Sequence, residues 1–191
     1  YNDGIGTVIK MATAYGDEIG IGVGDMTVAL VITQFVGVPF AFLFGRLAGR
    51  LGAKGAILLA LAVYTAISIG GYFMTTALHF YLLAAMVGTV QGGSQALSRS
   101  LFAVMVPRHK VSEMFGFFSS SAKLAGIAGP LLFGVVAHLS GVARAGILSL
   151  VVFFVVGGIL LARVDVAEGR RVARAAEAAH LGSGARGEAA S

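Results

Sequence analysis

Two glutamines and a serine in the middle of this chain have the side-chain types and the spacing of a polar binding surface. Gln91, Gln95 and Ser98 stand at i, i+4 and i+7, so a helix over 90–101 would place them on one face, with Arg99 beside it. The opposite side of that helix carries Val90, Ala96, Leu97 and Leu101. A polar stripe on an apolar helix is costly against lipid, so we expect it to face a protein interior or a watery cavity. The two amides could bind a polar solute there, or hydrogen-bond a neighbouring helix.

A second polar stripe lies at the start of the chain. Asp3, Thr7 and Lys10 stand at i, i+4 and i+7 and follow Asn2, within a segment 1–15 that is too short to cross a bilayer alone. An acid and a base at membrane depth usually pair and face a cavity, which makes Asp3 a candidate for coupling protons or for binding a substrate ammonium group. The alternatives are a purely structural pair of Asp3 with Lys10 or an asparagine, or a solvated surface segment. Gln34, in the next apolar segment, either lines a cavity or bonds a neighbouring helix.

The composition indicates that these stripes belong to a membrane protein. Of the 191 residues 57% are hydrophobic and only 12% are charged, whereas soluble domains carry about twice that share of charge. The chain has no cysteine, which excludes disulfides and thiolate metal sites. The formal net charge is +5, but the basic residues sit at the ends of apolar runs, a pattern typical of membrane topology and not of nucleic-acid binding.

The apolar runs predict an all-α membrane protein with about six transmembrane helices in residues 1–163, followed by a polar tail over 164–191. The chain begins inside a structured segment, which indicates a piece of a longer protein whose first helix is truncated. In the tail we expect a helix over 164–181 and disorder after Gly182. The full spans are expected at 26–47, 56–76, 80–106, 115–139 and 144–162.

The charges of the loops predict the orientation of these spans. If every span crosses, the loops 45–55 and 108–113 fall on the same side as the tail, and they hold most of the lysines and arginines. That side is therefore expected to be cytoplasmic, with the C-terminus inside. Small residues on the span 115–139 predict close helix packing, with a groove along Gly126, Pro130 and Gly134 and with Gly129 beside it.

Other classes of site find little support in the sequence. His79, His109 and His138 lie far apart at span ends and lack the spacing of metal ligands, so neither a metal nor a cofactor is expected. The chain also lacks the phosphate-binding loop of an ATPase. Two alternatives to a transporter stay open: a non-transporting membrane scaffold, and an intramembrane serine protease that would use Ser94.

The loop 45–55 resembles the motif G-x-x-x-D-R-x-G-x-[RK] of the major facilitator superfamily. Gly45, Arg50, Gly52 and Lys54 match it, whereas Gly49 replaces the aspartate, as in the weaker second copy of the motif, between helices eight and nine. Further stretches together resemble the vacuole-effluxer branch of that superfamily, the autophagy-related permeases. They are Tyr1–Gly4, Gln34–Pro39, Gly92–Ser100, Phe115–Ser119 and Val164–Gly169. The stretch Gly126–Gly134 resembles the G-x-x-x-G-P helix pattern of exporter members of the superfamily.

The resemblance implies the C-terminal half, helices seven to twelve, of a carrier that is not an enzyme. Such a half needs the lipid bilayer and a partner, either the missing N-terminal six-helix half or a second copy of itself. We expect a bacterial inner-membrane protein that moves small polar solutes by alternating access. Amino acids are one candidate class, because eukaryotic members of the branch are linked to amino-acid export. In this family the segment 1–15 and the span 80–106 would both line the cavity, in agreement with the two polar stripes.

Overall fold

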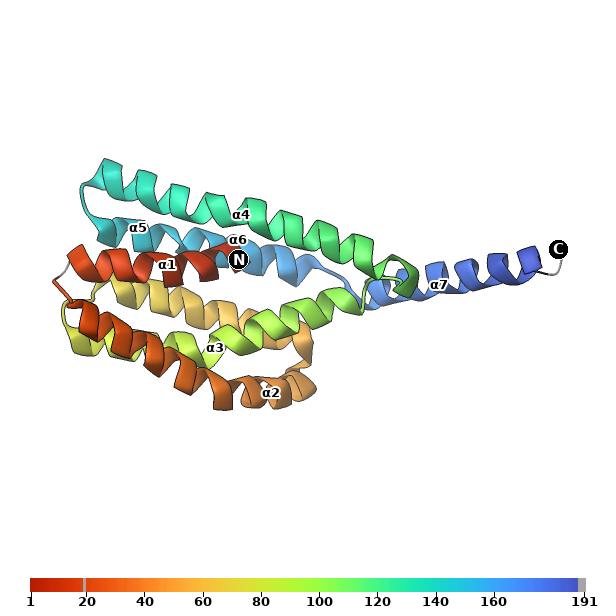
Figure 1. Cartoon of the computed structure of the whole chain (residues 1–191), viewed down its shortest axis with the longest axis horizontal. Helices are drawn as coiled ribbons and strands as arrows, with labels where there is room; N and C mark the ends of the chain where they lie inside the picture. The colour runs from red at the N-terminus through yellow and green to blue at the C-terminus, as the bar shows by residue number, and fades with distance from the viewer. Residues whose placement is uncertain (19, 189–191) are drawn as a thin grey trace.

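The computed structural model describes residues 1–18 and 20–188, and every regular element in them is a helix (Figure 1). This confirms the predicted all-α membrane fold. In chain order the helices are α1 (Asn2–Glu18), α2 (Val23–Tyr72), α3 (Ala77–Ala103), the short 3-10 helix η1 (Arg108–Lys110), α4 (Val111–Ser140), α5 (Ala143–Ser149), α6 (Val151–Arg163) and α7 (Val166–Glu188).

The helix α2 contains two of the expected spans, because the chain turns back at Gly52. This residue has φ of 75° and ψ of 158°, a backbone conformation that glycine adopts far more readily than other residues. Helix continues up to the turn and resumes directly after it, so the loop predicted over 45–55 is wrong in its extent. Only Gly52 departs from helical geometry in this segment, and the polar residues on either side of it belong to the two limbs of α2.

The helices form a bundle of roughly parallel rods, with α7 projecting from one end (Figure 1). The rods are α1, the two limbs of α2, α3, α4, and α5 with α6. Three segments are long and apolar enough to cross a membrane: Val23–Tyr72, Arg108–Ser140 and Ala143–Arg163. Because the first of these folds back on itself, it supplies two crossings.

The last expected span is made of α5 and α6, which follow each other with one residue between them. Residues 144–162 were expected to form one span, and Ala143–Arg163 is long and apolar enough to cross a membrane. The helix α5 ends at Ser149 and α6 begins at Val151, and Leu150 between them keeps right-handed helical φ and ψ of −67° and −20°. The Ser149 hydroxyl donates to the carbonyl of Gly146 at 2.6 Å.

Glycines allow the first limb of α2 and the helix α3 to pack closely. A Cβ atom on Gly88 would lie 2.7 Å from the carbonyl oxygen of Thr33, and one on Gly93 would lie 2.4 Å from the Phe44 side chain. Elsewhere Tyr64 stacks on Phe154 with ring centroids 5.3 Å apart. Many large apolar side chains outside these contacts are exposed, as expected for a surface that faces lipid. Examples are Phe35, Phe117 and Leu124, each more than 70% exposed.

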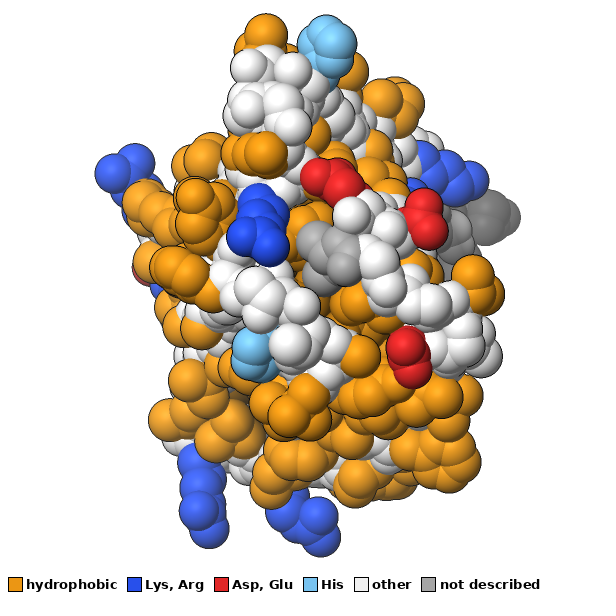
Figure 2. Space-filling view, turned by 90° about the vertical axis from the view of Figure 1, so that its left-hand side faces the viewer, with side chains coloured by type: hydrophobic (Ala, Val, Ile, Leu, Met, Phe, Trp, Pro, Cys, Tyr) orange, Lys and Arg blue, Asp and Glu red, His pale blue; other side chains and the backbone are white. Residues whose placement is uncertain are grey.

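Polar contacts join the connections at the end of the bundle that Figure 2 faces, where acidic side chains gather. Glu18 accepts a hydrogen bond from the backbone N–H of Ala143 at 3.3 Å, and Arg144 donates to the carbonyl of Met74 at 3.3 Å. The Tyr81 hydroxyl donates to the Asp25 carboxylate. The acidic side chains near the end of α1 and the start of α2 therefore link α1 to α5 and α2 to α3 at this end.

The opposite end of the bundle is basic and carries α7. The Lys54 ammonium group donates to the carbonyls of Ala162 and Val164 at 2.8 and 2.7 Å, where it caps the C-terminus of α6. The helix α7 pairs with the α3–α4 connection through Arg108 and Glu177, 3.6 Å apart. It continues past Gly182, where disorder was expected, and residues 189–191 lie outside the described part of the chain.

Candidate functional site

The polar stripe predicted on residues 90–101 lies on α3, and its members differ in their surroundings. Gln91 and Gln95 are half-buried, and in the described residues neither side-chain amide hydrogen-bonds to a neighbouring helix. The Ser98 hydroxyl donates to the carbonyl of Ser94 at 2.6 Å and contacts the hydroxyl of Tyr1, the residue that precedes α1. The serine thus joins α3 to α1, while the glutamines lie at the surface of the bundle with unused hydrogen-bonding capacity.

Ser94, the nucleophile of the protease alternative, lies inside the bundle. Its side chain is fully buried and donates to the carbonyl of Gln91 at 3.1 Å, within a continuous helix. His79 and His138 are exposed near the ends of α3 and α4, so neither can serve Ser94 as a base. Among the described residues no three His, Cys, Asp or Glu side chains are grouped so that they could hold a metal ion.

The polar stripe of α1 is divided between the interior and the surface. Asp3 is 8% exposed and Thr7 is 1% exposed, whereas Asn2 and Lys10 are exposed. The described residues contain two ion pairs, Arg108–Glu177 and Glu168–Arg171, so Asp3 is not paired with Lys10. Asp3 and Thr7 therefore form a buried site of their own.

Gly129 of α4 provides the space that Asp3 and Thr7 occupy. A Cβ atom at this position would lie 2.0 Å from the Thr7 hydroxyl oxygen and 2.9 and 3.0 Å from the two carboxylate oxygens of Asp3. By contrast, a Cβ atom on Gly126 or Gly134 would meet no atom within 4 Å. The predicted groove along Gly126, Pro130 and Gly134 is therefore not the contact within this bundle, and Gly129 beside it is.

Three further predicted residues lie on the surface of the bundle. Gln34 and Arg50 are exposed, and Gly45 has open space around it. Gly52 and Lys54 act structurally, as the turn of α2 and the cap of α6. The structure does not gather the predicted pathway residues into one pocket inside this bundle.

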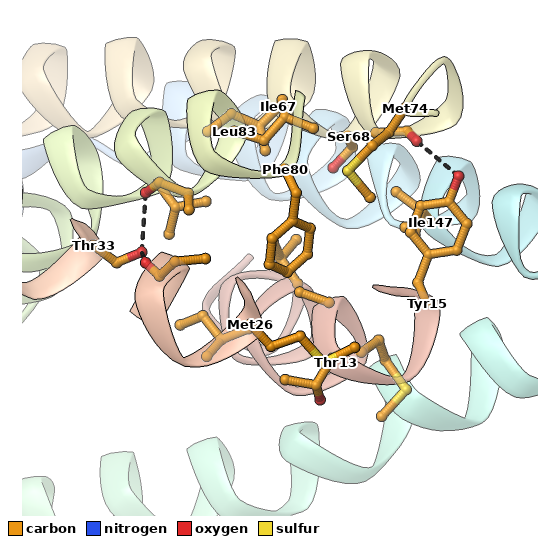
Figure 3. A pocket seen from close by; sticks show the side chains of 18 of the residues that line it. Thr13, Tyr15, Met26, Thr33, Ile67, Ser68, Met74, Phe80, Leu83 and Ile147 are labelled. Atoms are coloured by element: carbon orange, nitrogen blue, oxygen red, sulfur yellow. Dashed lines mark hydrogen bonds between the residues drawn. The ribbon is translucent and has the colours of Figure 1, made fainter. Parts of the chain in front are cut away.

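A cavity that the sequence did not predict lies between α1, both limbs of α2, α3 and α5 (Figure 3). It has a volume of about 90 Å³, and its lining is almost wholly apolar. The few polar groups at its wall are mostly paired: Tyr15 donates to the carbonyl of Gly71 at 3.1 Å, and Thr33 donates to that of Ala84 at 3.1 Å. Such a cavity suits hydrocarbon and not a polar solute. No sequence signal marked it, because its apolar lining comes from five separate segments.

Comparison with known proteins places the chain among membrane carriers. A family model described as "Vacuole effluxer Atg22 like" matches residues 1–174. An uncharacterized MFS-type transporter, YxiO of Bacillus subtilis, is 43% identical over 164 residues, which cover 86% of this chain and 38% of that protein. Autophagy-related protein 22 of Cryptococcus neoformans is 28% identical and covers 90% of this chain and 33% of its own length. MJ1560, an uncharacterized MFS-type transporter of Methanocaldococcus jannaschii, is 25% identical over 79% of this chain.

These relatives are longer than the chain, which spans about two fifths of YxiO and of MJ1560 and a third of the fungal protein. No solved structure matches the chain. The match to the family model covers both polar stripes, the turn at Gly52 and the Gly129 contact. The chain belongs to the Atg22-like vacuole effluxer family, a branch of the MFS-type membrane transporters.

Proposed function

We propose that this chain is the C-terminal six-helix half of a secondary carrier that moves small polar solutes, with amino acids as the first class to test, by alternating access. The coarser part of this proposal, a membrane transporter, follows from the family. The finer part depends on one observation: Gln91 and Gln95 lie half-buried on the surface of a membrane bundle, with no partner among the described residues.

Two unpaired amides at membrane depth are costly against lipid, which gives them a reason to face another protein surface or water. In carriers built from two helical halves, the substrate site lies between the halves near the middle of the bilayer. Asn2, Lys10 and Gln34 are further polar residues with exposed side chains. We infer that the second half, from the longer chain or from a second copy, covers part of this surface and encloses the wet cavity.

The cellular location belongs to the same proposal. We place the protein in a bacterial inner membrane, with the basic end of the bundle and α7 in the cytoplasm, because Lys and Arg favour the cytoplasmic side. The acidic connections around Asp17, Glu18 and Asp25 would then lie on the outer side.

Transport assays on the full-length protein test this function. The protein is reconstituted in liposomes, and counterflow of a panel of radiolabelled amino acids and other small polar solutes is measured. We expect Gln91→Ala and Gln95→Ala each to lower transport about 10-fold, since an alanine leaves a substrate polar group without its partner at a cost of 1–2 kcal/mol.

The matched control is Leu82→Ala, which shortens an exposed apolar side chain on the same helix and should leave transport unchanged. Equal transport by the wild type and both glutamine variants would contradict the proposed substrate path. Absence of counterflow for every solute would favour the scaffold alternative.

A further inference from the structure

One carboxylate oxygen of Asp3 and the hydroxyl of Thr7 lack hydrogen-bond partners at the place where α1 meets α4. Asp3 and Thr7 stand one helical turn apart, and three of their oxygens converge on Gly129. The Asp3 Oδ2 and Thr7 Oγ1 atoms are both fully buried, and neither has a hydrogen-bond partner. Leaving such groups unsatisfied costs about 1–3 kcal/mol each, and more for a charged carboxylate. The site therefore lacks a component that would satisfy both groups.

The conformation of Thr7 is unlike that of other threonines in this chain. Thr27, Thr33 and Thr65 each donate to the carbonyl four residues earlier, at 2.8 to 2.9 Å. That bond is available to any threonine in a helix interior. Thr7 does not make it, and its hydroxyl instead lies against α4. The side chain thus keeps its oxygen free at the helix interface.

The helix α4 also carries a backbone carbonyl without a helical partner, one turn before Pro130. Pro130 stands inside α4 and has no backbone N–H, so the carbonyl of Gly126 loses its helical partner. Asp3 has no ion pair, and Lys10, the nearest base along its helix, is exposed. The interface between α1 and α4 therefore combines a buried carboxylate that has no ion pair among the described residues with a buried hydroxyl that has no hydrogen-bond partner there.

We propose that Asp3 and Thr7 bind a dehydrated sodium ion between α1 and α4. A hard monovalent cation takes carboxylate, hydroxyl and carbonyl oxygens as ligands, and carriers use freed backbone carbonyls for this purpose. One cation satisfies both orphaned oxygens and neutralises the carboxylate at once. A proton on Asp3 neutralises the charge, but it leaves the Thr7 oxygen unmatched, because no hydrogen bond joins the two side chains. The binding of sodium at this site is independent of the proposed function. Only its role as a coupling ion for transport rests on that function.

Thermal unfolding of the purified full-length protein tests the site without a transport assay. The unfolding midpoint is measured in increasing NaCl, with choline chloride holding the ionic strength constant. We expect saturable stabilisation of the wild type by about 5 °C, because an ion that binds only the folded state raises its stability. Asp3→Asn and Thr7→Val should abolish the sodium response, and Thr7→Ser should keep it because it keeps the hydroxyl.

Thr13→Val is the matched control on the same helix. The Thr13 hydroxyl already donates to the carbonyl of Lys10 at 3.1 Å, so its removal should leave the sodium response intact. Equilibrium binding of radioactive sodium to the wild type gives a second measurement that needs no variant, and we expect one ion per chain. Together these measurements separate loss of the site from a general loss of folding.

Three results would overturn the proposal. They are no sodium binding by the wild type, a sodium response that survives both Asp3→Asn and Thr7→Val, and stabilisation that follows pH but not sodium, which would make Asp3 a proton site. Sodium binding without transport of any solute would instead leave the cation site in place and count against the carrier function. Transport without sodium binding would reject only the cation site.

Discussion

At the scale of single residues, Gly129 has the most constrained position at the candidate site. The missing side chain lets Asp3 and Thr7 reach the backbone of α4, and an added Cβ atom would lie 2.0 Å from the Thr7 hydroxyl oxygen. We expect Gly129→Ala to lower the free energy of unfolding by about 2 kcal/mol, because α1 and α4 must separate to relieve the overlap. Chemical or thermal unfolding of the purified protein in detergent measures this change.

Gly134→Ala on the same helix is the control for this variant. A Cβ atom there meets nothing within 4 Å, so the substitution should leave stability unchanged or raise it by roughly 0.5–1 kcal/mol through helix propensity. If both variants unfold at the same midpoint, the close approach at Gly129 is not a determinant of stability.

At the scale of elements, α3 packs closely against the first limb of α2 because glycines at the contact leave room for the backbones to approach. Gly92 and Gly93 are neighbours in the sequence, but only Gly93 faces Phe44 closely, with 2.4 Å between an added Cβ atom and the ring. At Gly92 the nearest atom would be the Cβ of Ala41 at an ordinary 3.7 Å. Alanine substitutions at these two adjacent positions should therefore differ in their effect on the free energy of unfolding.

We expect Gly93→Ala to destabilise the protein by about 1–3 kcal/mol and Gly92→Ala to be nearly neutral. The cost at Gly93 arises because the ring of Phe44 is buried and has no free space to move into. Unfolding midpoints of the two variants, measured side by side, check the expectation. A larger loss for Gly92→Ala would mean that α3 is rotated relative to this packing.

At the scale of the whole molecule, the two ends of the bundle differ in charge and in what they connect. The Gly52 turn, the α3–α4 connection and α7 share one end, and the connections around Asp17, Met74 and Ser140 share the other (Figure 1). Single cysteines test which end is cytoplasmic, and these 191 residues contain no native cysteine to interfere.

We expect a membrane-impermeant maleimide to label Asp17→Cys in intact cells and to label Arg50→Cys only after the membrane is permeabilised. Both native side chains are exposed, so a difference in labelling reports the side of the membrane and not burial. The opposite pattern would reverse the proposed orientation. Labelling of both positions in intact cells would contradict an odd number of crossings between them.

The sequence by itself determined the class of protein, the number of rods and the face of α3 that carries polar groups. Hydropathy is a local property, so runs of apolar residues mark membrane helices before any packing is known. Proline and glycine positions placed the ends of the segments within a few residues. The loop expected over 45–55 is longer than the turn in the structure, because its basic residues continue the helix on both sides of Gly52.

Only the tertiary structure decided which faces of the helices meet. Asp3, Thr7 and Lys10 share one stripe in the sequence, yet the first two are buried against Gly129 and the third is exposed. The rotation of each helix about its axis depends on contacts with residues more than a hundred positions away. Gly126 and Gly129 look equivalent along the chain, but in the folded bundle only Gly129 contacts α1. The periodicity of the sequence shows which residues share a face of a helix, and only the packing of the helices shows what that face contacts.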